Sequence, residues 1–175
     1  EASVAVEEAQ EFPGSVSRTD PDTGVAHRGS QMWLQRFVEE APDALLVPGL
    51  SRLTWVSPLR QDRFCEYQDA AFLQALGLSA LVEQLSGFWP RRGPVWDGLA
   101  LAGEVPVLVE AKAHTREFLT SPCDASAPMS TAKIKAALTA CKAALGADER
   151  SDWTRCYYQY ANRLAHLWWL HSQGV

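Results

Sequence analysis

The sequence has no apolar run long enough to cross a membrane. A bilayer-spanning helix needs roughly 18 or more consecutive apolar residues, whereas the richest stretch, residues 164–170, is interrupted by His166. The first residues are acidic and lack the basic and then apolar pattern of a signal peptide. These absences predict no membrane-spanning helix and no membrane partner.

The sequence also lacks paired cysteines. Its four cysteines contain no CxxC pair, and none of them has a histidine at a spacing typical of zinc sites. We therefore expect no structural zinc and no disulfide framework, which favours a reduced, cytoplasmic setting. Because there is no initiator methionine, we expect a processed or excised piece of a longer protein. Two hypotheses on assembly stay open: a homodimer, or a partner domain of a longer protein.

Positive charge is not in excess. The formal net charge is −5, but it is unevenly spread, since residues 1–29 hold six acids and two bases. The remaining body is nearly neutral, with fifteen acids and fourteen bases. A nuclease needs a local basic groove rather than a basic average, so this distribution weakens the expected affinity for nucleic acid without excluding chemistry on it.

The pattern along the chain predicts a flexible N-terminal arm over residues 1–29 and a single domain over residues 30–175. Turn-forming residues and a lack of apolar periodicity mark the arm. In the domain we expect a short strand at residues 53–56 and helices at residues 30–40, 62–76, 79–85, 130–146 and 152–172. This order predicts an α+β fold with a small mixed sheet, built around a central β-hairpin and flanked by helices.

Residues 95–113 predict that hairpin. Two apolar runs flank Gly103 and Glu104, and a glycine that opens a two-residue loop is typical of a type II′ turn. With that turn, the residue numbers of paired positions sum to 207, so Asp97 lies opposite Glu110. Opposed side chains share a face with Cβ atoms roughly 4.5–5.5 Å apart, and alternation adds Lys112 to the same face.

Two opposed carboxylates in an apolar hairpin need a compensating partner. Their mutual repulsion and their burial both disfavour the charged forms. A divalent cation relieves this, and Mg²⁺ is commonly bound by one or two carboxylates together with water and substrate phosphate. The pattern predicts that Asp97 and Glu110 bind Mg²⁺ (or Mn²⁺), while Lys112 orients water or stabilises charge on a phosphoryl group.

The arrangement of Pro94-Val95-Trp96-Asp97 followed by Glu110-Ala111-Lys112 resembles the two half-motifs of the PD-(D/E)xK restriction-endonuclease-like nucleases. The resemblance covers about twenty residues of this chain. It implies a core of a helix, three antiparallel strands, a helix and a further strand. No strand is expected after the last helices, which indicates a core truncated at the C-terminus or a variant topology.

Several other residues are candidates for the same site. The resemblance implies an acidic metal ligand on the helix before the sheet, which here is Glu66. On the last helix, Gln159 and Arg163 share a polar face that either contacts substrate or is simply solvated, and the solvated alternative is favoured. His114 follows Lys112 by alternation and is a further candidate for phosphate contact.

The sequence therefore predicts a Mg²⁺-dependent nuclease that acts on DNA or, as the weaker alternative, on RNA. Its catalytic residues are Asp97, Glu110 and Lys112, and Glu66 contributes to the metal site. A different class of function stays open: a catalytically inactive nuclease-like fold that serves as a binding or assembly module. For the three catalytic candidates themselves, the competing interpretation is an edge hairpin whose charges form an ion pair.

Overall fold

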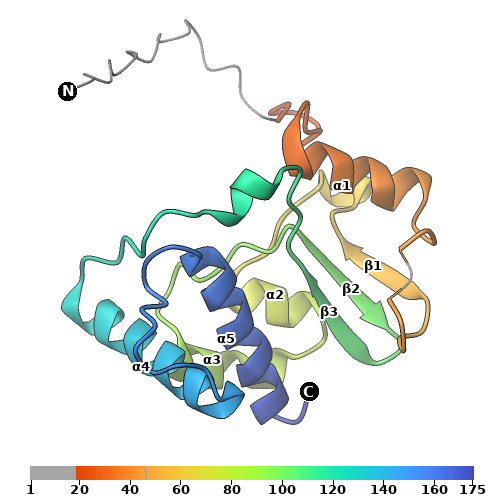
Figure 1. Cartoon of the computed structure of the whole chain (residues 1–175). Helices are drawn as coiled ribbons and strands as arrows, with labels where there is room; N and C mark the ends of the chain where they lie inside the picture. Colours follow the sequence, from red (N-terminus) through yellow and green to blue (C-terminus); the bar gives the residue numbers. More distant parts are fainter. Residues whose placement is uncertain (1–18, 46) are drawn as a thin grey trace, which may run out of the picture.

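The computed structural model describes residues 19–45 and 47–175, which form helices around a three-stranded sheet (Figure 1). In chain order the elements are α1 (Gly29–Glu40), β1 (Leu53–Ser57), α2 (Asp69–Ala75), α3 (Val82–Phe88), β2 (Gly98–Ala102), β3 (Val105–Val109), α4 (Pro128–Leu145) and α5 (Tyr158–Ser172). Short 3₁₀ turns lie at Arg60–Asp62, Ser79–Leu81 and Thr115–Phe118. The α+β class predicted from the sequence is confirmed.

The sheet has the order β1-β2-β3, and both strand pairs are antiparallel. The prediction of a mixed sheet was therefore wrong for the described strands. The hairpin register is confirmed, because Leu99 pairs with Leu108 and Ala102 with Val105. Gly103 takes a φ of +65°, which the first residue of the tight turn requires and which glycine adopts without steric cost. Among the residues that the structure describes, no fourth strand follows β3.

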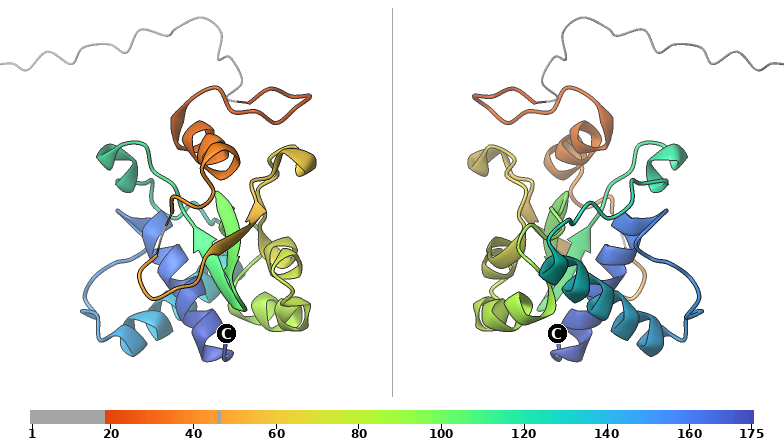
Figure 2. Two further views of the ribbon diagram at one scale, coloured as in Figure 1. Left: turned by 90° about the vertical axis from the view of Figure 1, so that its right-hand side faces the viewer. Right: turned by 90° about the vertical axis from the view of Figure 1, so that its left-hand side faces the viewer.

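Both faces of β2 are buried, as its uninterrupted apolar sequence predicts. On one face, Ala100 and Ala102 pack in a small core with Leu34 and Val38 of α1. On the other face, Leu99 joins the main core, which is formed largely by α2, α3, α4 and α5. Figure 2 shows α1 set apart from these four helices, with the sheet between them. The hairpin is thus held rigidly from both sides.

The helix predicted over residues 62–76 is much shorter in the structure. Arg63 and Phe64 have left-handed backbone conformations, with φ of 55° and 54°, and these interrupt the helix after the 3₁₀ turn. Phe64 gains burial in exchange, since its side chain is only 4% exposed. The chain then runs extended, and Tyr67 pairs with Trp96 in an antiparallel bridge. This segment carries Glu66, which therefore does not lie on a helix.

The N-terminal boundary also differs from the predicted arm. Residues 1–18 lie outside the described residues, whereas residues 19–28 form a turn that folds back on α1. Thr19 bridges to Ala26, and the buried Gln35 side chain accepts a hydrogen bond from the Ala26 amide at 2.8 Å. Gln35 also donates to the carbonyl of Gly24. The described end of the chain is therefore fixed to the first helix.

The predicted orientation of the last helix was wrong. It begins at Tyr158 rather than near residue 152, because Tyr157 has a φ of +65°. Its polar residues Asn162 and His166 are buried, while Tyr160 and Leu167 are exposed. The face expected to be solvated thus lies against the sheet and the core. Tertiary packing overrides the hydrophobic pattern here because the inward polar groups find partners.

His166 is the most enclosed of these inward polar residues. Its Nδ1 lies 2.8 Å from the carbonyl oxygen of Asn162, and its ring packs against Trp89 and Trp96. Since the partner is a carbonyl, Nδ1 carries the proton and donates. Burial lowers the pKa of His166 to about 4, so the imidazole is neutral at neutral pH.

We expect acid to destabilise the protein through His166. The pKa is about 6.5 when unfolded and about 4 when folded, so its contribution is complete above pH 6.5 and is lost as pH falls towards 4. The loss is about 3 kcal/mol by pH 4. Urea unfolding of the wild type and His166→Gln should show a stability difference that shrinks over this range. His171→Gln, on the exposed side of the helix, should show no such trend, and a constant difference for His166→Gln would contradict the assignment.

Candidate functional site

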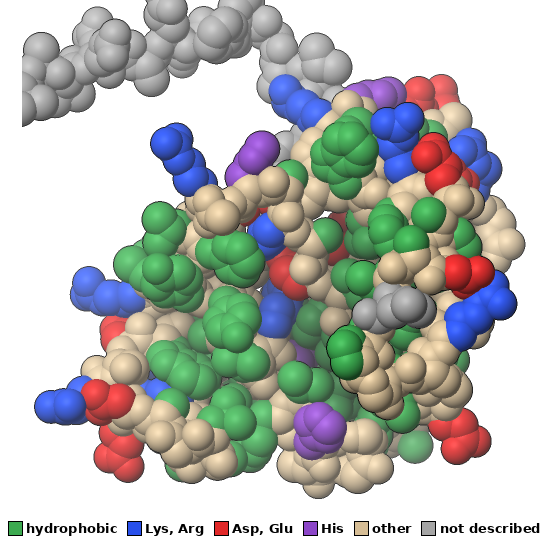
Figure 3. Space-filling view, turned by 45° about the vertical axis from the view of Figure 1, so that its right-hand side comes forward, with side chains coloured by type: hydrophobic (Ala, Val, Ile, Leu, Met, Phe, Trp, Pro, Cys, Tyr) green, Lys and Arg blue, Asp and Glu red, His purple; other side chains and the backbone are tan. Residues whose placement is uncertain are grey.

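A cleft of about 710 Å³ opens where the hairpin strands end, between α1 and α5. Its lining residues are Arg28, Gly29, Ser30, Gln31, Glu66, Asp97, Lys112, His114, Glu117 and Gln159. In the space-filling view, acidic and basic side chains are visible inside a hollow of this face, with hydrophobic side chains gathered beside it (Figure 3). The structure thus brings five of the seven predicted site residues to one cleft, and the other two, Glu110 and Arg163, adjoin it.

Asp97 lies immediately before β2, beside the end of β3. The hairpin register places it opposite Glu110, and its Oδ2 accepts a hydrogen bond of 2.7 Å from the Ala111 amide. Desolvation, followed by the charge of Glu110, raises the pKa of Asp97, while the Ala111 hydrogen bond and the nearby cations lower it in part. The carboxylate is therefore held in place but is incompletely compensated.

Glu66 reaches the same position from a different element. The Tyr67–Trp96 bridge is antiparallel, so the residue before Tyr67 lies across from the residue after Trp96. This places Glu66 beside Asp97. Burial, then the charges of Asp97 and Glu110, raise the pKa of Glu66 to about 7, against a smaller opposing effect of a hydrogen bond from Gln31. Near neutral pH this carboxyl is divided between its protonated and ionised forms.

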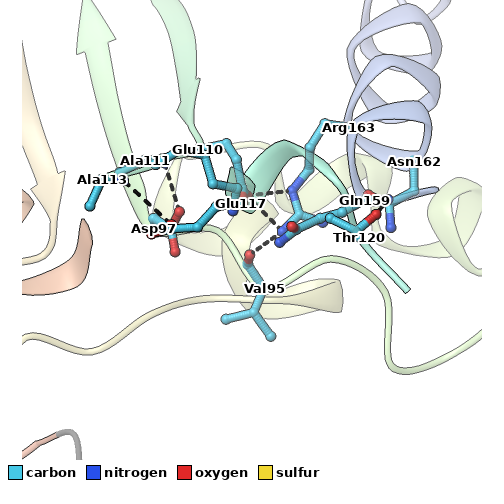
Figure 4. Close-up of polar contacts among 11 residues, drawn as sticks. Val95, Asp97, Glu110, Ala111, Ala113, Glu117, Thr120, Gln159, Asn162 and Arg163 are labelled. Carbon is cyan, nitrogen blue, oxygen red and sulfur yellow. Dashed lines mark hydrogen bonds and ion pairs between the residues drawn. The ribbon is translucent and has the colours of Figure 1, made fainter. Parts of the chain in front are cut away.

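Glu110 is fully engaged by two cations. Lys112 donates to its Oε1, and Arg163 donates to its Oε2 at 2.7 Å. Figure 4 shows Asp97 and Glu110 coming from the two hairpin strand ends, with Arg163 reaching Glu110 from α5. These contacts bear out part of the ion-pair interpretation, because Glu110 is paired within the site. Among the described carboxylates of the cleft, Asp97 and Glu66, together with Glu117 at its edge, have no salt bridge to a cation.

Arg163 also fixes the surroundings of the pair. Its guanidinium donates to the Val95 carbonyl at 2.8 Å and to Asn162 Oδ1 at 2.7 Å. The same group lies 5.1 Å from the centre of the Trp96 ring, a distance typical of a cation–π contact. Arg163 therefore joins α5 to both hairpin strand ends, and a role as a direct substrate contact would require it to leave these partners.

The N-terminus of α1 supplies positive potential to the cleft. Arg28 precedes the helix, and no side chain caps the helix start. The first amides of a helix lack internal partners and carry partial positive charge, and here the residues of this first turn line the cleft. The sequence analysis missed this contribution, because neither Arg28 nor Gln31 belongs to a motif.

Three further residues position the site or border it. The Asp69 carboxylate accepts hydrogen bonds from the amides of Arg92 and Gly93, at 3.0 and 2.8 Å. It thereby fixes the loop that leads to Asp97. Glu117, which the sequence analysis did not single out, lines the cleft and accepts a long hydrogen bond of 3.4 Å from the Ala113 amide. His114 lines the cleft mouth and is exposed.

The donor set fits a hydrated divalent cation better than a fully enclosed one. The described residues contain no group of three or more histidine, cysteine or acidic side chains placed to enclose a metal ion. Mg²⁺, however, usually keeps several waters and takes only one or two carboxylates from the protein. Asp97 and Glu66 meet that requirement. Glu110 would have to exchange one of its two cations for the metal.

Comparisons with known proteins found no relative of this chain. No family model matches the chain, and no curated protein or solved structure matches it. The described part of the chain also contains no helix that is long and apolar enough to span a membrane. The cleft is therefore the feature of the molecule that bears on its function.

Proposed function

We propose that the protein is a metal-dependent phosphodiesterase of the PD-(D/E)xK type that cleaves DNA or, as the weaker alternative, RNA. The observation that carries this proposal is the pair of undercompensated carboxylates, Glu66 and Asp97, beside Lys112 in an open cleft. Both carboxyls have raised pKa values, and strongly perturbed acids grouped in a cleft are typical of functional sites. A purely structural cluster would be expected to neutralise them.

Each residue has a separate role in this proposal. Asp97 and Glu66 would hold the cation, and Asp97 is oriented for this by the Ala111 amide. A divalent cation supplies the Lewis acid that polarises a phosphoryl oxygen and activates water. Lys112 stabilises the negative charge that develops on the phosphoryl group, while Glu110 and Arg163 keep the lysine amine in position.

The cleft wall offers contacts for the phosphodiester backbone. Anions bind readily at helix N-termini because free amide groups and the helix dipole point towards them. The start of α1, with Arg28 before it, lies on one wall, and His114 lies at the mouth. A phosphate seated between these groups would face Lys112, Asp97 and Glu66, which is the position that the chemistry requires.

The decisive experiment is cleavage of circular and linear DNA by purified protein, with Mg²⁺, Mn²⁺ or EDTA. We expect metal-dependent cleavage by the wild type and none by Asp97→Asn, because the amide removes a negative metal ligand at nearly constant shape. Circular dichroism and thermal unfolding should show that the variant is folded. Cleavage that persists in Asp97→Asn, or that resists EDTA, would overturn the proposal.

The second candidate function, a non-catalytic binding or assembly module, is favoured by the engagement of Glu110 with Lys112 and Arg163. A Mn²⁺ titration by calorimetry separates the two. A catalytic site should bind the ion through Asp97, so the heat of binding should disappear in Asp97→Asn. A folded wild type that neither binds Mn²⁺ nor cleaves DNA or RNA would favour the module.

A further inference from the structure

A second hollow, of about 260 Å³, adjoins the cleft on the side of α5. It is lined by Glu110, Lys112, Glu117, Phe118, Thr120, Gln159 and Tyr160. Lys112, Glu117 and Gln159 line both the hollow and the cleft. A molecule that places a phosphate beside Lys112 can therefore extend directly into the hollow.

Two aromatic side chains border this hollow and are unusually open to solvent. Phe118 is 48% exposed and Tyr160 is 56% exposed. They come from different elements, the 3₁₀ turn Thr115–Phe118 and helix α5. Flat aromatic faces at the edge of a phosphate-binding cleft are the usual means by which proteins hold unpaired nucleobases, because each base has a π-face that stacks on them.

The hollow also has polar atoms able to meet the edge of a base. The Gln159 side chain, which faces both spaces, carries an amide with two donors and an acceptor. The Thr120 hydroxyl accepts a hydrogen bond of 3.1 Å from the Gln159 amide nitrogen of the main chain, which fixes the start of α5 against this loop. An apolar surface suited only to a protein partner would not need the Gln159 side-chain amide and the Thr120 hydroxyl beside Lys112.

The charge of the molecule argues against a double-stranded substrate. Duplex binding depends on many lysine and arginine contacts to closely spaced phosphates, whereas residues 30–175 are nearly neutral, with fifteen acids and fourteen bases. Lys133 and Lys142 are not free for such a track, because Lys133 donates to the Ser86 carbonyl of α3 and Lys142 donates to backbone carbonyls of the loop after α4. The basic side chains that line the cleft are Arg28, Lys112 and His114. This small number of basic groups suits the phosphates of a single strand better than those of a duplex.

We infer that the hollow between Phe118 and Tyr160 holds an unpaired nucleobase, so that the substrate is single-stranded nucleic acid whose backbone passes Lys112. This inference rests on the proposed function, since that function puts a phosphodiester in the cleft. The aromatic faces hold the base, Gln159 meets its edge, and the loop at residues 113–117 follows the backbone. Sequence preference is weak, since stacking accepts every base.

The inference is tested by binding, separately from cleavage. Fluorescence anisotropy in EDTA compares a short labelled oligothymidylate with a duplex of the same length. The single strand should bind more tightly. Phe118→Ala and Tyr160→Ala should each weaken single-strand binding by about tenfold, the loss of one stacking contact, with little change for the duplex. Tyr160→Phe keeps the ring and should bind as the wild type does.

Trp33→Ala is the matched control. This tryptophan is 59% exposed but lines neither space, so its loss should leave binding unchanged. An oligonucleotide with an abasic position at the seated base loses its contacts with both rings, so it should bind the wild type more weakly than the normal strand binds Phe118→Ala. With the abasic strand, Phe118→Ala should cause no further loss, because the contact that it removes is already absent.

The outcomes separate this inference from the proposed function. Equal binding of single strand and duplex, or wild-type affinity in both alanine variants, overturns the inference, and metal-dependent cleavage that depends on Asp97 would then survive on its own. If the wild type cleaves nothing but the stacking pattern is found, the inferred single-strand site stands and the catalytic proposal fails.

Discussion

Lys112→Met is expected to slow metal-dependent cleavage by about 10²–10³-fold, which is the usual cost of removing one charged or donor group from a phosphoryl or oxyanion site. The lysine is part of the lining of the cleft, next to Asp97 and Glu66. Methionine keeps the length of the side chain and removes its charge. The loss should appear in the rate at saturating substrate, because the group acts on charge that develops during the reaction.

The fold should tolerate this substitution, since Glu110 keeps its bond to Arg163. Thermal unfolding of the variant provides that check. Lys112→Arg is the informative comparison variant. It retains the charge on a planar, longer group and should recover only part of the cleavage rate. A Lys112→Met protein that is stable and cleaves at the wild-type rate would show that the amine only neutralises Glu110.

The hairpin could be predicted from the sequence because its information is local. A glycine in a two-residue loop fixes the register, and the register fixes which side chains oppose each other. The observed pairs Leu99–Leu108 and Ala102–Val105 follow from Gly103 alone. The position of Asp97 opposite Glu110 follows in the same way, so the centre of the site was predictable without tertiary contacts.

The rest of the site depends on contacts between distant segments. Glu66 meets Asp97 through the bridge between Tyr67 and Trp96, which are far apart in sequence. No periodicity in residues 62–76 signals that bridge, and left-handed residues interrupt the helix that the pattern favours. The approach of the α1 N-terminus to the cleft is likewise a result of packing.

The last helix shows why a polar stripe is an ambiguous signal. Its polar residues share one face, as expected from their spacing, but that face is turned inward. His166 stays neutral among aromatic rings, Asn162 supplies hydrogen-bond acceptors, and Arg163 pairs with Glu110. These polar groups thus have partners within this helix or at the ends of the hairpin strands. This orientation of the helix leaves Tyr160 exposed, where it can stack on the inferred nucleobase.

Arg163→Met is expected to lower the free energy of unfolding by about 3–4 kcal/mol, because it leaves Glu110 with an incomplete set of partners in a largely enclosed place. The side chains of Arg163 and Glu110 are only 12% and 20% exposed. The variant also loses the bond to the Val95 carbonyl and the contact with Trp96. Urea unfolding measures the change, and Arg150→Met, in an exposed pair with Asp148, should change stability by less than about 0.5 kcal/mol.

The double variant Arg163→Met/Glu110→Gln separates the pair from the rest of the arginine's contacts. If the cost of Arg163→Met comes from the Glu110 carboxylate that has lost a partner, the double variant should recover about half of the lost stability. Glutamine at this position has no charge that would be left without its partner. It should cleave more slowly than the wild type, since Lys112 then loses the carboxylate that holds its amine. A double variant no more stable than Arg163→Met would instead assign the cost to the contacts with Val95 and Trp96. That result would mean that Arg163 acts chiefly by connecting α5 to the hairpin. The position of the Lys112 amine would then depend more on helix packing than on the charge of Arg163.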